Sequence, residues 1–96
     1  MIVSMLQVIL EMPGVTSIKE KRQRVNSLKH RIIRKFKVSA AEVDLHDSIG
    51  FAQIGVAVVS NSRRYGEGMM NKILTFCEDE FDGRVHDTSI HSENYQ

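Results

Sequence analysis

Two long apolar runs, Met1–Met12 and Phe51–Ser60, constrain the fold of this chain more than any other feature of its sequence. Successive side chains of a β-strand point to opposite faces of its sheet, so a strand with one wet face alternates between apolar and polar residues. Both runs are instead apolar on both parities, and Pro13-Gly14 ends the first with turn chemistry. The sequence therefore predicts two central strands that are apolar on both faces.

Each of these strands is followed by a segment with the apolar spacing of an amphipathic helix. The first helix is expected over about Ser17–Phe36, with Ser17 as its N-cap. The second is expected over about Arg63–Phe81, with Asn61 or Ser62 as its cap. The predicted buried stripes are Val25, Leu28, Ile32 and Phe36 in the first helix and Tyr65, Met69, Ile73 and Phe76 in the second.

The two remaining strands are predicted from shorter patterns. Val38–Asp47 alternates from Val43 onward, with Val43 and Leu45 on one side and charged residues on the other, as in an edge strand with one wet face. Arg84–His91 supplies a short last strand. The segment Ser92–Gln96 is expected to be a loose polar tail.

This element order predicts an α+β, ferredoxin-like β-α-β-β-α-β sandwich, in which two helices cover one face of a four-stranded antiparallel sheet. A chain of 96 residues holds one such domain, so residues 1–96 are expected to form a single unit. The first and third strands then lie in the middle and expose an apolar patch on the helix-free face. Such a patch is usually covered by a partner or a second copy. The residues of this predicted interface are Val3, Met5, Ile9, Phe51, Ala57 and Val59.

The charges of the chain are distributed unevenly, although the formal net charge is only +1. Nine of the 13 Lys and Arg residues lie in the segment Lys19–Lys37 against a single acid, Glu20, so this segment carries +8 and the rest of the chain −7. Charges of one sign that lie within a Debye length of roughly 8–10 Å act together on a partner. The first helix is therefore expected to present a basic surface.

A basic helix of this kind is suited to the phosphates of RNA or DNA, because neutralising several phosphates releases counterions without any base contact. Cations on the outer face of a helix also serve solubility alone, and this alternative stays open. Few aromatic side chains are available to stack on bases, since the chain has no Trp and only Phe51 is expected on the sheet. The candidate phosphate contacts are Lys19, Lys21, Arg22, Arg24, Arg31, Arg34 and Lys35.

The sequence offers no candidate for catalysis, a metal ion or a cofactor. The predicted topology separates His30, His46, His86 and His91, whereas a zinc site needs three or four ligands around one ion. Cys77 is expected to be a small buried residue, and the acidic run Glu78–Asp82 a solvated face. A single cysteine, no apolar run of membrane-spanning length and no leader-like N-terminus predict a cytoplasmic protein without a membrane role.

Three motifs taken together resemble the YlxP-like family of small bacterial proteins, a domain of unknown function. They are Ser-Ile-Lys-Glu-Lys-Arg at Ser17–Arg22, Phe-Lys-Val-Ser-Ala-Ala-Glu-Val at Phe36–Val43, and Ile-Gly-Val-Ala-Val-Val-Ser-Asn at Ile54–Asn61. The resemblance implies a ferredoxin-like fold, a bacterial cytoplasmic setting and gene association with translation and ribosome-maturation factors.

From the basic helix and this resemblance, we expect a non-catalytic RNA- or ribosome-associated binding domain. The alternative is a homodimeric or protein-interaction module that uses the apolar open face of the sheet and has no nucleic-acid role. The sequence identifies neither the partner nor any sequence preference.

Overall fold

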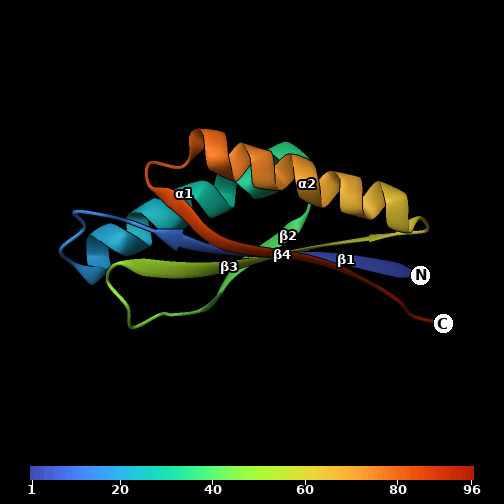
Figure 1. Ribbon diagram of the computed structural model, residues 1–96, viewed down its shortest axis with the longest axis horizontal. Coiled ribbons are helices and arrows are strands. Elements are labelled where there is room, and N and C mark those ends of the chain that lie inside the picture. The colour runs from blue at the N-terminus through green and yellow to red at the C-terminus, as the bar shows by residue number, and fades with distance from the viewer.

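The computed structural model describes all 96 residues and contains six elements in the predicted order (Figure 1). The strands are β1 (Ile2–Glu11), β2 (Ser39–Asp44), β3 (Phe51–Ser60) and β4 (Arg84–Asn94), and the helices are α1 (Ile18–Phe36) and α2 (Arg63–Glu80). The strands form one antiparallel sheet in the order β2-β3-β1-β4, and both helices lie on the same face of it. The predicted α+β, ferredoxin-like architecture is confirmed.

The parity of the two central strands decides which residues enter the core. Even-numbered residues of β1 and β3 face the helices, with Leu6 opposite Val56 and Val8 opposite Ile54. These side chains are almost fully buried and belong to a single cluster of 15 apolar residues, to which α1 and α2 also contribute. The apolar odd-numbered residues of the same strands consequently lie on the open face of the sheet.

The predicted ends of α1 agree with the structure, and so does its buried stripe at Val25, Leu28 and Ile32, whereas Phe36 is only half-buried. Ser17 Oγ accepts a hydrogen bond of 3.1 Å from the backbone N–H of Glu20, as an N-cap does. The helix ends at Phe36, and its C-cap Lys37 adopts a left-handed conformation (φ 58°) and donates its N–H to the carbonyl of Ile33. Neither helix combines the length and the apolar character that a membrane span requires.

The buried face of α2 is rotated about the helix axis relative to the stripe that the sequence predicted. Its buried residues are Gly66, Met70, Ile73 and Cys77. Of the predicted stripe only Ile73 is buried, whereas Met69 and Phe76 are half-buried and Tyr65 is 57% exposed. The cause is the close approach of α2 to β1 at Gly66, where a side chain would collide with Ser4. The buried face of α2 therefore combines two small residues, Gly66 and Cys77, with Met70 and Ile73.

The expectation of a loose tail after His91 was wrong, because β4 continues to Asn94 along the full length of β1. Ser92 is buried, and its Oγ forms a hydrogen bond of 2.8 Å with Ser4 Oγ. Beyond the strand, the N–H of Tyr95 donates to the carbonyl of Met1 at 2.7 Å. The two ends of the chain thus lie at the same end of the sheet (Figure 1).

Lys21 is the most unusual residue of the core, since its side chain is only 1% exposed. Its ammonium donates hydrogen bonds to the carbonyl oxygens of Leu45 and His46, the latter at 3.4 Å, in the connection between β2 and β3. The same Nζ lies 3.3 Å from Glu42 Oε2. That oxygen is buried without a hydrogen bond, so its attraction to Lys21 is one of charge. The ammonium joins α1 to the edge of the sheet.

This pairing reverses the predicted faces of β2. The alternation placed Val43 with the apolar side and Glu42 with the wet side, but Glu42 is turned toward α1 and Val43 is 48% exposed on the open face. The ladder to β3 shifts register between Glu42 and Asp44, and β2 ends at Asp44 rather than Asp47. A charged partner on α1 thus overrides the local pattern, because an unpaired buried ammonium would be far more costly than one exposed valine.

Replacing Lys21 with Met keeps most of the apolar stem but removes the ammonium, so the loop carbonyls and Glu42 lose their partner. We expect the free energy of unfolding, measured by urea denaturation, to fall by about 2–4 kcal/mol. The matched control is Lys19→Met, an exposed position without an ion pair, where a change within about 0.5 kcal/mol is expected. Similar small losses in the two variants would contradict a structural role for Lys21.

Two glycines of α2 provide a second pair of matched variants. A Cβ at Gly66 would overlap Ser4 Oγ and lie 2.7 Å from Ser4 Cβ, whereas a Cβ at Gly68 would meet nothing within 4 Å. Gly68→Ala should raise the free energy of unfolding by about 0.5–1 kcal/mol through helix propensity. Gly66→Ala should lower it by about 1–3 kcal/mol, because overpacking outweighs the same gain. Thermal or urea unfolding of both variants checks the sign of each change, and a stabilised Gly66→Ala protein would refute the close approach.

Candidate nucleic-acid interface

Two of the predicted phosphate contacts, Arg24 and Arg31, are paired with acids at the end of α2. Arg24 Nη2 lies 2.9 Å from Asp82 Oδ2, and Arg31 Nη2 lies 3.1 Å from Glu80 Oε2. Both pairs are partly exposed, so each contributes little to stability by itself. The acidic run was expected to be a solvated face, but two of its carboxylates neutralise arginines of α1.

Lys21 was wrongly predicted as a phosphate contact, because its ammonium is buried beneath α1 and held by Leu45, His46 and Glu42. The sequence signal for this error is visible afterwards: Lys21 stands four residues before Val25, on the buried stripe of the helix. The neighbouring Lys19 and Arg22 are exposed without ion pairs. The start of α1 therefore presents two accessible cations rather than three.

The C-terminal end of α1 presents the remaining cations of the prediction. Arg34 and Lys35 stand in the last turn and Lys37 caps the helix, and all three are exposed with no carboxylate within 4 Å. Part of their charge offsets the negative end of the helix dipole. On the other helix, α2, Lys72 is also exposed and lacks an ion pair. These four residues, Arg34, Lys35, Lys37 and Lys72, are called the basic end below.

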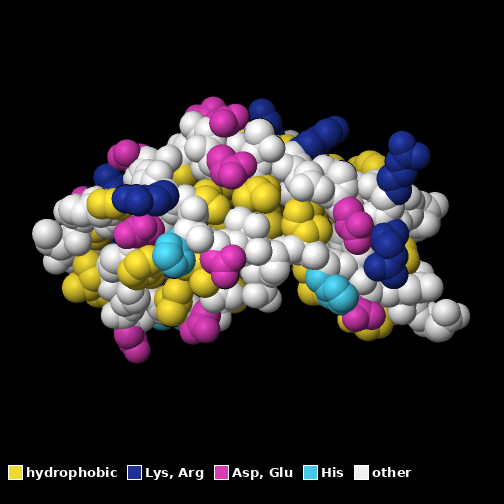
Figure 2. Space-filling model, in the orientation of Figure 1, with side chains coloured by type: hydrophobic (Ala, Val, Ile, Leu, Met, Phe, Trp, Pro, Cys, Tyr) yellow, Lys and Arg dark blue, Asp and Glu magenta, His cyan; other side chains and the backbone are white.

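Positive and negative charges also lie on different halves of α2. Figure 2 shows Lys and Arg side chains over the N-terminal half of α2 and Asp and Glu side chains over its C-terminal half. The acids at that end oppose the helix dipole, which favours cations there. The arginines of α1 compensate them from the side. The arginines in the middle of α1 are thereby neutralised, whereas the cations at the two ends of α1 keep their charge.

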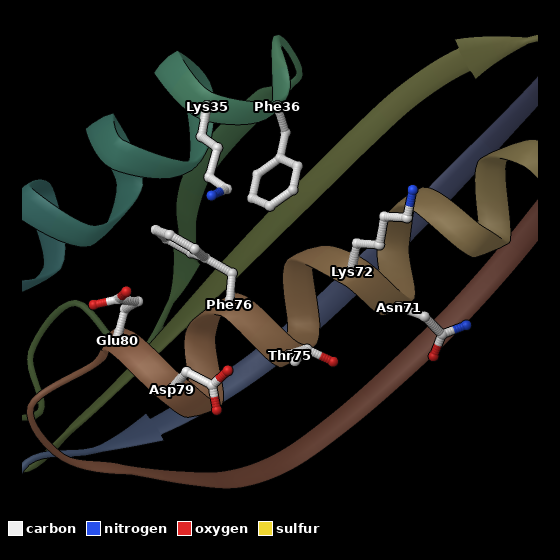
Figure 3. Close-up of a pocket in the computed structure, with 8 residues that line it drawn as sticks. All are labelled: Lys35, Phe36, Asn71, Lys72, Thr75, Phe76, Asp79 and Glu80. Carbon is white, nitrogen blue, oxygen red and sulfur yellow. The ribbon is translucent and has the colours of Figure 1, made fainter.

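A cleft of about 530 Å³ opens between the two helices beside the basic end. It is lined by Lys35, Phe36, Asn71, Lys72, Thr75, Phe76, Asp79 and Glu80. Figure 3 shows Lys35 and Phe36 extending from the end of α1 toward α2, and Phe76 and Lys72 extending from α2. The two rings meet edge to face, with centroids 5.5 Å apart and an interplanar angle of 83°. The ammonium of Lys35 lies 5.4 Å from the centroid of the Phe76 ring.

Sequence reasoning missed this cleft and the participation of Lys72. It assigned Phe36 and Phe76 to the buried stripes, but both rings are only half-buried, at the margin of the core. A helical projection of α1 and α2 places both at the side of the apolar stripe rather than its centre. That signal was present in the sequence. The juxtaposition of the two helices, which makes a cleft of these residues, was not.

The open face of the sheet carries all six residues of the predicted interface. The register pairs Val3 with Val59, Met5 with Ala57 and Glu11 with Phe51, and Ile9 lies on the same face. Most of these side chains are half-buried by their neighbours, but Val59 is 61% exposed. Small residues of β2 and β3 leave a groove of about 320 Å³ in this face, bounded by Met5 and Val43. Whether the face is covered by a partner stays a prediction.

The groups considered for metal binding and nucleophilic chemistry are dispersed or buried. No group of three or more His, Cys, Asp or Glu side chains is positioned to hold a metal ion. Cys77 lies in the core, where burial and, secondarily, the charge of Glu78 raise the pKa of its thiol to about 11. Almost none of it is thiolate at neutral pH, so Cys77 acts as a small apolar side chain.

Comparisons with known proteins give two matches in sequence. Residues 3–90 match the model of a family described as "Protein of unknown function (DUF503)". The chain is also 34% identical over 62 residues to the uncharacterized protein YlxP of Bacillus subtilis (strain 168). This match covers 65% of this chain and 67% of the relative.

Solved structures that resemble the chain are distant in sequence. One is the de novo designed protein Ferredog-Diesel, at 11% identity and a TM-score of 0.43, over 96% of this chain and 84% of that one. Another is the crystal structure of an Arabidopsis thaliana protein, at 9% identity and a TM-score of 0.47, over 98% of this chain and 95% of that one.

Proposed function

The chain belongs to the DUF503 family of proteins of unknown function, and from its surface we propose that it is a non-catalytic domain that binds RNA, with ribosomal RNA as its expected partner. Membership of this family confirms the resemblance to YlxP-like proteins that the motifs predicted. A cytoplasmic location, expected from the single cysteine, is part of the proposal.

The observation that carries the proposal is the set of unpaired cations at the basic end. Arg34 and Lys35 stand in the last turn of α1, Lys37 is its C-cap, and Lys72 of α2 lines the same cleft as Lys35. A cation that is already paired must lose its carboxylate before it binds a phosphate, whereas an unpaired one only releases counterions from the RNA. The basic end therefore supports phosphate binding better than Arg24 and Arg31 do.

The basic end also differs from a face that merely confers solubility. Two of its cations, Lys35 and Lys72, line a cleft with two aromatic rings, and Lys35 lies over both rings, at 5.8 and 5.4 Å from their centroids. A ligand at this place meets charge and apolar surface together, as single-stranded nucleic acids require. The outer flank of α1, with Lys19 and Arg22, offers charge without such a cleft.

The test is binding of purified ribosomal RNA across a salt series, with Arg34→Gln/Lys37→Gln compared with Lys19→Gln/Arg22→Gln. Both double variants remove two exposed, unpaired cations from α1, at ends of the helix that are roughly 20 Å apart. If each removed cation contacts one phosphate, the magnitude of the slope of log affinity against log salt should fall by about 1.5–2 in the first variant and stay unchanged in the second.

Three results would contradict the proposal. Absence of wild-type binding at low salt would exclude RNA as the partner. Equal losses in the two double variants would mean that the charge of α1 acts diffusely rather than at the basic end. A wild-type affinity that does not depend on salt would exclude phosphate recognition.

A second candidate function, a homodimer formed through the open face, is supported by the exposure of apolar side chains there. Val43, which lines the groove over β3, is 48% exposed, Val59 on the same face is 61% exposed, and a second copy of this face would cover both. Sedimentation at micromolar concentration should then give a dimer for the wild type and a monomer for Val59→Asp. Asn26→Asp, an exposed polar position on α1 and therefore on the helical side of the sheet, is the control that should stay dimeric. A monomeric wild type would exclude this candidate.

A further inference from the structure

We propose that the cleft between α1 and α2 is a site for one unpaired nucleotide of single-stranded RNA, and that it favours bases with an exocyclic amino group. The inference rests on the proposed function and goes further, since a phosphate-binding surface alone would not distinguish single strands from duplexes. The aromatic rings, the cations and the carboxylates of the cleft each support one part of this proposal, namely the base, the phosphate and the amino group.

The size and the aromatic lining of the cleft fit a nucleotide. A volume of about 530 Å³ lies within the usual range of small-molecule sites. Phe36 and Phe76 are half-buried at its wall and perpendicular to each other, so a flat base lying against one ring meets the edge of the other. The Phe76 ring already has Arg31 at 5.3 Å and Lys35 at 5.4 Å, whereas Phe36 has only Lys35 at 5.8 Å. Phe36 is therefore the better platform for stacking.

The cleft carries both cations and carboxylates: Figure 3 shows Lys72 on one side of Phe76 along α2, Asp79 and Glu80 on the other side, and Lys35 extending from α1 between them. Lys35 and Lys72 have no carboxylate within 4 Å, so both are available to a phosphate. Asp79 and Glu80 line the same cleft and would repel a phosphate there. Glu80 is held by Arg31, at 3.1 Å, but Asp79 forms no ion pair. A cleft made only for phosphate would not include this free carboxylate.

Asp79 instead suits the amino edge of a base. Carboxylates accept hydrogen bonds from the exocyclic amino group of cytosine, and adenine carries a comparable donor, whereas uracil presents a carbonyl oxygen at that position. Thr75 adds a hydroxyl that donates or accepts beside it. The base edges of an RNA duplex are already paired, so an unpaired base is the one that presents its amino group to Asp79.

The test measures binding of three 12-nucleotide probes by fluorescence anisotropy: oligo(C), oligo(U) and a 12-base-pair RNA duplex. Wild type should bind oligo(C) more tightly than oligo(U), and both single strands more tightly than the duplex. Phe36→Leu should weaken oligo(C) binding about tenfold. The matched control is Phe51→Leu, a half-buried ring on the open face of the sheet, which should leave the affinity unchanged.

Two surface variants keep the test independent of folding, because Phe36 also packs against the core. Asp79→Asn and Lys72→Gln change exposed side chains of α2. Asp79→Asn should abolish the preference for oligo(C) over oligo(U), and Lys72→Gln should weaken both single strands by a similar factor. Thermal unfolding of every variant shows whether a loss of binding reflects a loss of structure.

The outcomes separate this inference from the function on which it rests. RNA binding that is lost in Arg34→Gln/Lys37→Gln but unchanged in Phe36→Leu, Asp79→Asn and Lys72→Gln would overturn the nucleotide site and leave the proposed function standing. A duplex bound as tightly as oligo(C) would also overturn it. No binding of any RNA would refute both.

Discussion

The buried ammonium of Lys21 is the interaction on which the arrangement of the helical layer and the sheet edge depends. It joins α1 to two backbone carbonyls of the β2–β3 connection and to Glu42 of β2. A charge taken out of water is tolerated only when its donors are satisfied, so these partners fix both the position of the loop and the inward face of β2. The surface positions of the other cations of α1 follow from this anchoring.

The charge of α1 serves several purposes that its sequence does not distinguish. Lys21 is structural, Arg24 and Arg31 join α1 to the end of α2, and the last turn of the helix keeps unpaired cations. The segment carries +8 by sequence, but its accessible and unpaired part is smaller and lies mainly at the ends of the helix. An electrostatic surface is determined by which charges remain unpaired after folding, rather than by the number along the chain.

The interhelical cleft and the groove of the open face lie on opposite sides of the sheet and are therefore compatible, and the basic end reaches the edge of the open face at Lys37, which lines a pocket with Val59. The helical layer carries the basic end and the interhelical cleft, whereas the open face carries Val59, Val43 and the groove. A homodimer through the open face would leave both copies of the cleft accessible. It would also present two basic ends in one assembly, which raises the effective concentration of the second for a long RNA.

The sequence by itself determined the order of the elements, the ends of α1 and the parity of β1 and β3. These follow from neighbours within one strand or one turn of helix, such as Ser17 and Glu20 at the N-cap. The length of β4 was underestimated because its polar residues show little periodicity and are ordered by pairing with β1. Sequence patterns also placed the six apolar residues of the open face correctly, although not what covers them.

Only the tertiary structure decided the roles of individual side chains. Arg24 meets Asp82 across 58 positions of sequence, and Lys21 meets Leu45 across 24. The buried face of α2 was set by the contact of Gly66 with β1, and the cleft by the approach of Phe36 to Phe76. Burial and pairing depend on residues that are distant along the chain, so local periodicity predicts where a helix lies but not which of its charges remain free.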